Sequence, residues 1–194
     1  MVGHLTAWRM LFGRRALQPG ESVLIVGIGG GVAVACLQLA QMVGARVFVT
    51  SSSDAKISRA VAMGASGGVN YRKDVVSDAV LEMSDGGVDM VVNYTGGDTW
   101  VPSLRVLKRG GRLLVCGATA GFAPTEDLRY IWTFELRIIG SNSWAPSDLE
   151  TLMKMIAEGR LKPTIDTVLP LEQTREGVRQ LRDREVIGKI VIEP

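Results

Sequence analysis

Histidine and cysteine are scarce in this chain, which has 194 residues but one histidine, His4, and two cysteines, Cys36 and Cys116. The two cysteines belong to no CxxC pair and to no ligand set that includes a histidine. We therefore expect no zinc or other metal site built within the chain. Both cysteines stand in apolar segments, and core thiols of this kind are typical of a reducing cytoplasm, which is the predicted location.

An excess of charge of either sign is also lacking, since 22 lysines and arginines face 20 aspartates and glutamates. The basic residues are scattered, so the sequence predicts neither a nucleic-acid partner nor a membrane-binding face. The start of the chain lacks the pattern of a signal peptide. Residues 22–45 carry no charge, yet four glycines within five positions, with Gln38 and Gln41, favour a buried strand and helix over a membrane span.

What the chain does have is a glycine turn between an apolar strand and an apolar helix. Residues 22–26 suit a strand buried on both faces, residues 32–43 suit a helix of small residues, and residues 46–50 suit a second strand. This order predicts a dinucleotide-binding unit, in which a pyrophosphate lies against the positive end of the helix. The turn that presents bare N–H groups contains Gly27, Gly29, Gly30 and Gly31.

Two registers of the dinucleotide-binding pattern GxGxxG fit this turn. One begins at Gly27 and has Val32 at its sixth position, whereas the other uses Gly30 and Gly31 and ends on Ala33, a small residue that the pattern allows. Either register places the same helix start at the phosphate.

The end of the second strand carries serines where an acidic residue usually binds the adenosine ribose. Ser51, Ser52 and Ser53 occupy this place, and Lys56 follows one helical turn later. A carboxylate would repel a 2′-phosphate, whereas hydroxyls and a lysine would bind it, so the pattern favours NADP(H) over NAD(H). Helix capping by the serines and a solvated lysine explain the same residues without a ligand.

Strands and helices alternate along the rest of the chain. An amphipathic helix is expected in residues 3–18, and further strands in 68–71, 88–96, 112–117 and 136–142. One helix is expected to begin at Asp74, and a second to run through Trp100, Leu104 and Leu107 and to end at Gly110 and Gly111. A short helix is expected within 118–135, and a last one from a capping box at 147–150 to Gly159. Right-handed crossovers then give an α/β fold with a doubly wound parallel sheet of the Rossmann type, which binds ligands at the carboxyl ends of its strands.

The last part of the chain departs from this alternation. Residues 164–168 and 189–193 are expected to be strands, with a helix between them. We therefore predict a dinucleotide-binding domain in residues 1–160 and a C-terminal segment, residues 161–194, that belongs partly to another unit.

The order of these motifs resembles the medium-chain dehydrogenase/reductase superfamily, nearest its quinone oxidoreductase and zinc-independent alcohol dehydrogenase-like branch. The matching stretches, which extend over almost the whole chain, include TAW, SVLIVGIGGGV, TSSSDAK, GGRLLVCGATAG and GKIVI. The matching stretches include no part of the family's N-terminal GroES-like domain, to which the C-terminal segment returns in the family. We therefore expect residues 161–194 to be partly unsupported and mobile.

The resemblance implies roles for individual residues. The position of a zinc-ligand cysteine in zinc-dependent relatives is Val2 here, which cannot bind metal. The residues implied at the phosphate loop are Gly27, Gly29, Gly30, Gly31 and Val32; around the 2′-phosphate and adenine, Ser51, Ser52, Ser53, Lys56 and Tyr71; and around the nicotinamide and its ribose, Thr6, Thr95, Gly96, Gly117, Ala118 and Asn142.

The function that the resemblance implies is zinc-independent hydride transfer between NADP(H) and a small carbonyl, enone or quinone. No constellation of His, Cys or carboxylates indicates acid–base or nucleophilic catalysis, so no catalytic residue is assigned. The family also implies a homodimer that pairs the edge strand 136–142 with its symmetry mate. The alternative is a cofactor-binding module without turnover, as in a truncated or degenerate dehydrogenase.

Overall fold

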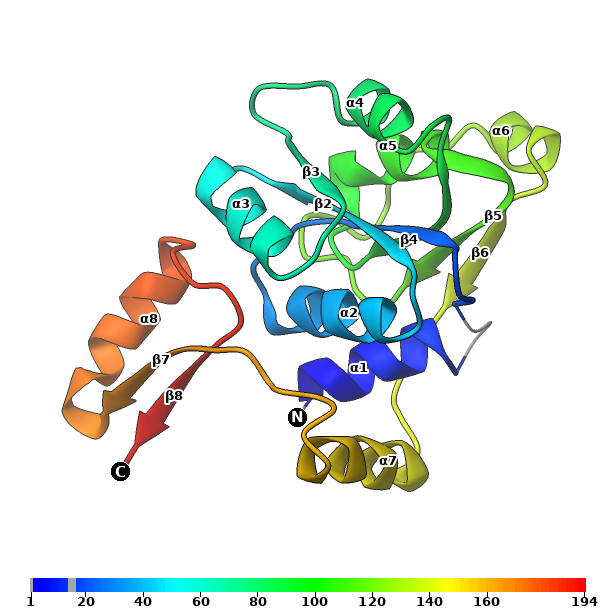
Figure 1. Cartoon of the computed structure of the whole chain (residues 1–194). Helices are drawn as coiled ribbons and strands as arrows, with labels where there is room; N and C mark the ends of the chain where they lie inside the picture. The colour runs from blue at the N-terminus through cyan, green and yellow to red at the C-terminus, as the bar shows by residue number, and fades with distance from the viewer. Residues whose placement is uncertain (1, 14–16) are drawn as a thin grey trace.

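The structure is a computed structural model that describes residues 2–13 and 17–194 of the chain (Figure 1). Its centre is a six-stranded parallel sheet with the strand order β3-β2-β1-β4-β5-β6. This is the order of the Rossmann fold, so the predicted doubly wound sheet is confirmed. The strands are β1 (Ser22–Ile25), β2 (Arg46–Ser51), β3 (Gly67–Asn70), β4 (Val88–Asn93), β5 (Leu107–Val115) and β6 (Arg137–Gly140).

Helices cover both faces of this sheet. The first core contains α1, α2 and α7, and the second lies under α4, α5 and α6 (Figure 1). The helices are α1 (Val2–Leu11), α2 (Gly31–Met42), α3 (Asp54–Ala62), α4 (Val76–Met83), α5 (Trp100–Arg105), α6 (Leu128–Thr133), α7 (Pro146–Ala157) and α8 (Thr174–Arg182), with short 3₁₀ turns η1 (Gly97–Thr99) and η2 (Leu171–Gln173). The predicted first helix extends to residues 14–16, which lie outside the described residues.

The central strands are apolar on both sides because each side faces a core. Val23 and Ile25 of β1 belong to the core under α1 and α2, whereas Leu24 and Val26 belong to the opposite one. Strands with this double burial are typical of parallel sheets. The uncharged stretch 22–45 is thus divided into β1, the glycine turn and α2, and no helix in the described part of the chain is long and apolar enough to cross a membrane.

The prediction of a helix that runs through Leu107 to the Gly110–Gly111 pair is wrong after Arg105, where α5 ends. Leu107 begins β5 and pairs with Val88, and the next pairing joins Met90 to Arg112, so residues 108–111 bulge out of the ladder. Gly110 takes a φ of +75° in this bulge. Pairing with β4 outweighs the helical spacing of the leucines, which is a weak local preference.

The predicted capping box at residues 147–150 is also displaced. The residue that caps α7 is Ala145, followed by Pro146 at the first helical position, and the Asp148 carboxylate accepts a hydrogen bond from the Ala145 N–H at 2.8 Å. Proline suits this position because its missing N–H has no partner there in any case. The helix therefore begins one residue before the predicted serine cap.

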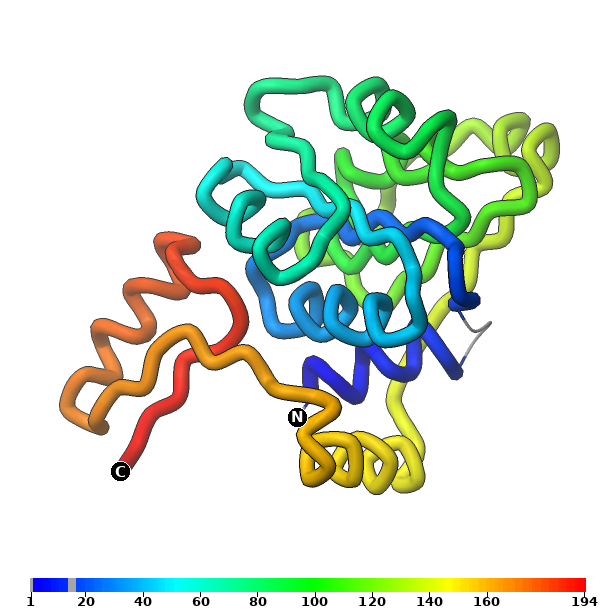
Figure 2. Tube along the Cα trace, viewed as in Figure 1, coloured from blue at the N-terminus to red at the C-terminus, as the bar shows by residue number. Residues whose placement is uncertain are grey.

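The C-terminal segment forms a small unit of its own. Strands β7 (Ile165–Pro170) and β8 (Lys189–Glu193) make a two-stranded parallel sheet that α8 covers, with Gly177 lying close to Leu169 and Ile190. Figure 2 shows this unit, orange to red, beside α2 and α3 and apart from the large sheet. The predicted boundary between residues 160 and 161 stays a prediction.

Candidate functional site

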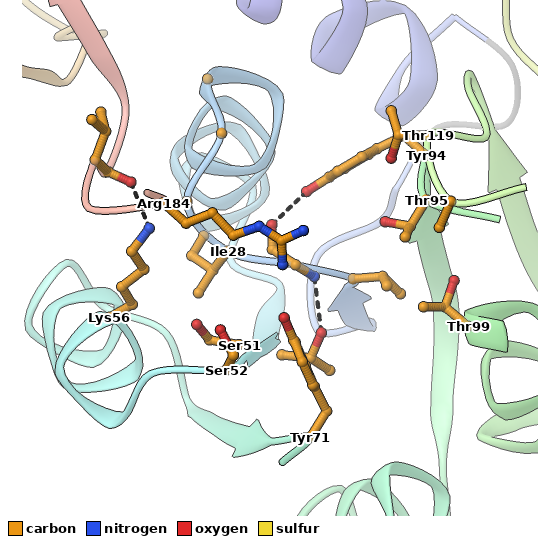
Figure 3. Close-up of a pocket in the computed structure, with 18 of the residues that line it drawn as sticks. Ile28, Ser51, Ser52, Lys56, Tyr71, Tyr94, Thr95, Thr99, Thr119 and Arg184 are labelled. Atoms are coloured by element: carbon orange, nitrogen blue, oxygen red, sulfur yellow. Dashed lines mark hydrogen bonds between the residues drawn. The ribbon is translucent and has the colours of Figure 1, made fainter. Parts of the chain in front are cut away.

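A cavity of about 1030 Å³ opens at the carboxyl ends of the central strands (Figure 3). The glycine turn, the end of β2, the loop after β4 and the C-terminal segment all contribute to its walls. Nine of the residues predicted to bind the cofactor line it: Gly27, Gly29, Gly30, Gly31, Ser51, Ser52, Lys56, Tyr71 and Thr95.

The other predicted residues lie behind this wall or beside it. On α1, the Thr6 hydroxyl donates to the Val2 carbonyl at 3.0 Å, and Asn142 is exposed after β6. Gly96 is buried in the loop after β4, where an added Cβ would contact Ala118. The residues outside the lining are Thr6, Val32, Ser53, Gly96, Gly117, Ala118 and Asn142, and their proposed contacts with the cofactor stay predictions.

Thr50, the penultimate residue of β2, holds the glycine turn in place. Its hydroxyl oxygen accepts a hydrogen bond from the Gly27 N–H at 2.9 Å, and its carbonyl accepts one from the Ile28 N–H at 2.7 Å. Gly27 adopts a φ of +84°, a conformation that side chains disfavour. The turn is therefore formed before any ligand arrives.

The start of α2 presents an uncompensated positive end to this cavity. Gly30 caps the helix without a side-chain hydrogen bond, and the first turn contains no acidic residue. The first N–H groups of a helix have no partner within the helix, and together with the helix dipole they favour an anion. A pyrophosphate is the anion that a Rossmann fold holds at this position.

The three serines at and after the end of β2 have two different roles. Ser53 caps α3, because its hydroxyl accepts from the Lys56 N–H at 3.4 Å, so the capping interpretation holds for this residue. Ser51 and Ser52 line the cavity. Asp54, which follows Ser53 in the chain, is exposed and hydrogen-bonded to Lys73, and this hydrogen bond lowers the pKa of Asp54.

Three cations lie around the cavity, and two of them were not predicted. Lys56 donates to the Val186 carbonyl at 2.8 Å, and burial lowers its pKa. Arg184 extends across the opening above Ile28 (Figure 3). Lys189 lies so close to Gly31 that an added Cβ there would collide with its side chain. The C-terminal segment thus supplies a wall of the cavity.

Asn93, at the end of β4, organises the loop on the other side of the cavity. The side chain is buried, and its carbonyl oxygen accepts from the Thr95 and Gly96 N–H groups at 2.8 and 2.9 Å. Its amide donates to the hydroxyls of Thr99 and Ser103 at 3.0 and 2.9 Å. Both hydroxyls donate their own hydrogens to backbone carbonyls, so they meet the Asn93 amide as acceptors.

We expect Asn93→Ala to lower the free energy of unfolding by about 2–4 kcal/mol, because several buried polar groups lose their partner. Urea unfolding measures this change. Ser103→Ala removes one acceptor of the Asn93 amide and one hydroxyl donor to the Thr99 carbonyl, and should cost about 1 kcal/mol. A loss in Asn93→Ala no larger than that of the serine variant would contradict the central role of Asn93.

Tyr94 is a further cavity residue that sequence reasoning missed. Its phenol donates to the Gly27 carbonyl at 2.8 Å, and burial raises its pKa, so it stays protonated. Among the described residues, the cavity lining contains no histidine or cysteine, and no three His, Cys, Asp or Glu side chains meet to form a metal site. The cavity is built to hold and orient a ligand.

Comparison with known proteins places this geometry among dehydrogenases. A family model described as zinc-binding dehydrogenase matches residues 31–158. Acryloyl-coenzyme A reductase from Sulfurisphaera tokodaii is 31% identical over 189 residues, which cover 93% of this chain and 54% of the relative.

Solved structures agree with this match. The crystal structure of an NAD-dependent alcohol dehydrogenase has a TM-score of 0.88 at 37% identity, covering 99% of this chain and 56% of that one. A 2-octenoyl-CoA carboxylase reductase, solved with NADP and 2-octenoyl-CoA, has a TM-score of 0.88 at 26% identity, covering 97% and 47%. The chain thus spans about half the length of these relatives. The match of the family model to most of the chain, together with the shared fold, confirms the predicted family: the chain belongs to the medium-chain dehydrogenase/reductase superfamily and corresponds to its cofactor-binding domain.

Proposed function

We propose that the chain binds NADP(H) and serves as the cofactor-binding part of an oxidoreductase. The observation that carries this proposal is the charge of the cavity: a helix start without a side-chain cap and three cations face it, and the three residues after Thr50 are serines. Phosphates of a dinucleotide match these groups, since backbone N–H groups, lysine and arginine all favour them.

The residues present fit such a cofactor from end to end. The start of α2 is suited to the pyrophosphate, and Ser51, Ser52 and Tyr71 are suited to the adenosine with its 2′-phosphate. The hydroxyls of Thr95 and Thr119 line the opposite part, where the nicotinamide and its ribose would lie. When bound, a reduced nicotinamide supplies a hydride, and the protein orients it and excludes water.

The choice of NADP(H) rests on this chain's own residues, because the similar structures differ. One is described as NAD-dependent and another was solved with NADP. In this chain the only carboxylate among the described cavity residues is Asp98, which belongs to the turn after β4 and not to the end of β2. A 2′-phosphate at the end of β2 therefore meets serines and cations.

For the reaction, we propose hydride transfer to an activated double bond or carbonyl: an enone or enoyl thioester, a quinone or a small carbonyl. The names of the relatives support this class, since one reduces acryloyl-coenzyme A and another is quinone oxidoreductase-like. The test follows NADPH absorbance with crotonyl-CoA, naphthoquinone and a small aldehyde. Acceptor-dependent NADPH consumption by at least one of them supports the proposal.

A cofactor-binding module without turnover is the second candidate. It is favoured by the cavity lining, in which the described residues include no histidine or cysteine for acid–base or nucleophilic chemistry. Hydride transfer needs the acceptor held about 3–3.5 Å from the nicotinamide, so residues that hold the acceptor against the nicotinamide ring are required. Tight NADPH binding without consumption of any acceptor would decide for the module.

We also propose that the edge strand β6 pairs with its copy in a homodimer. Ile138 on this strand is 42% exposed, and β6 is bonded on one side only, to β5. The Ser141 N–H donates to the Val115 carbonyl of β5 at 2.8 Å. Because successive N–H groups of a strand point to opposite sides, the Ile138 N–H points away from β5. An open apolar edge of this kind favours pairing with another strand.

Ile138→Pro should therefore release monomers while leaving the ladder between β5 and β6 in place, because proline removes only the outward N–H. Analytical ultracentrifugation of the variant and of Ile138→Val, which keeps the N–H, measures the change. A monomeric unmodified chain, or a proline variant that remains a dimer, would contradict pairing through this edge.

A further inference from the structure

An ion pair outside the cavity joins the C-terminal segment to α3. One carboxylate oxygen of Asp166, on β7, lies 2.5 Å from a guanidinium nitrogen of Arg59. The same oxygen accepts a hydrogen bond from the Ile187 N–H at 3.4 Å. Asp166 is 15% exposed and Arg59 45% exposed, and neither is among the described residues that line the cavity.

The backbone that Asp166 contacts lies directly on the glycine turn. Gly188 N–H donates to the Gly29 carbonyl at 2.8 Å, and the Val186 carbonyl accepts from Lys56 at 2.8 Å. Val186 and Ile187 are buried. Residues 184–189 are therefore packed against the cofactor cavity, although the C-terminal segment as a whole was expected to be partly unsupported.

Asp166 also balances the charge at this junction. Arg59 and Lys56 stand three residues apart on α3, and Arg184 approaches Lys56 from the C-terminal segment. Asp166 favours the charged form of Lys56, whereas Arg59 and Arg184 oppose it. Without the carboxylate, cations on α3 and on the segment would face one another and repel.

We propose that Asp166 is a positioning residue for cofactor binding: through Arg59 and the Ile187 backbone it holds residues 184–189 against the glycine turn. Arg184 and Lys189 then face the phosphates of the dinucleotide. The inference rests on the proposed function for its second step, since the cations matter only if the cavity takes a phosphorylated cofactor. Its first step, the docking of residues 184–189, concerns the chain without any ligand.

The test uses the whole chain and its variant Asp166→Asn, which keeps the size of the side chain and an oxygen for the Ile187 N–H. Hydrogen exchange of the amides of residues 186–189 is measured without cofactor, and NADPH is then titrated by fluorescence. We expect exchange of these amides to become about ten-fold faster and NADPH binding to weaken about 3- to 10-fold. Global urea unfolding should change little.

Further variants separate positioning from a general loss of stability. Arg59→Gln removes the same ion pair from the other side and should reproduce both effects. Arg59→Lys keeps the positive charge, so amide exchange and NADPH binding should stay close to those of the unmodified chain. Arg109→Gln is the control, since Arg109 forms a more exposed ion pair with Glu135 at 2.7 Å, between β5 and the loop after α6. It should change neither amide exchange at residues 186–189 nor NADPH binding.

Unchanged amide exchange in Asp166→Asn would overturn the inference, because the segment would then dock without the carboxylate. Faster exchange with unchanged NADPH affinity would overturn it as well, because docking would not serve binding. If the unmodified chain binds no dinucleotide, the proposed function fails, and the exchange measurement alone decides whether Asp166 docks the segment.

Discussion

Gly30→Asp should weaken NADPH binding at least about 100-fold while leaving the stability of the chain unchanged or slightly higher. Gly30 caps α2 with φ of −74°, and no heavy atom lies within 4 Å of a Cβ added there, so the fold accepts a side chain. Aspartate is a favourable helix cap whose oxygen accepts from the free N–H groups. It would therefore occupy the donors intended for the pyrophosphate and add a repelling charge.

Gly30→Asn is the matched control, because it has the same size and capping ability without the charge. We expect its NADPH affinity to fall less than that of the aspartate variant, and thermal unfolding to be similar in both. Fluorescence titration and thermal melts measure the two properties. An aspartate variant that binds NADPH as well as the unmodified chain would exclude a phosphate at the start of α2.

Ser52→Asp should reverse the proposed preference for NADPH over NADH. Ser52 is partly buried in the cavity wall after β2, where a carboxylate would meet the 2′-phosphate and could accept instead from a free ribose hydroxyl. Loss of a charge-assisted contact removes about 1.5–3 kcal/mol, and repulsion adds to it. We expect NADPH to bind about 30- to 100-fold more weakly and NADH to bind a few-fold more tightly.

The control for this change is Ser52→Asn, which is similar in size but uncharged. It should weaken NADPH binding only slightly, because no like charge faces the phosphate. Titration of both cofactors against both variants gives the ratio of dissociation constants. An unchanged ratio in Ser52→Asp would show that the end of β2 does not contact the 2′-phosphate.

Local sequence patterns predicted the central unit well. The strand, glycine turn, helix and second strand expected in residues 22–50 appear as β1, the turn, α2 and β2, because their apolar runs and the glycines between them are local signals that the distant pairing reinforces. The Leu107 region was mistaken for helix because pairing with β4, which is far away in the chain, decides its conformation. Ala145 was missed as a cap because alanine has no capping side chain, and Pro146 and Asp148 act in its place.

The residues of the candidate site also differ in whether local sequence patterns could predict them. Gly27, Ser52 and Lys56 were found because they belong to the motif itself. Arg184 and Lys189 come from more than a hundred residues later in the chain, and no periodicity links them to the glycine turn. The sequence shows there only two basic residues five positions apart, a spacing that by itself is typical of a solvated surface.

We propose that this cavity holds a dinucleotide with a 2′-phosphate. Titration of the unmodified chain with NADPH and with NADH, followed by fluorescence at one ionic strength, tests it most directly. Serine hydroxyls and the cations predict that NADPH binds about 10- to 150-fold more tightly, the range that a charge-assisted phosphate contact supports. Equal affinities, or tighter binding of NADH, would contradict the account.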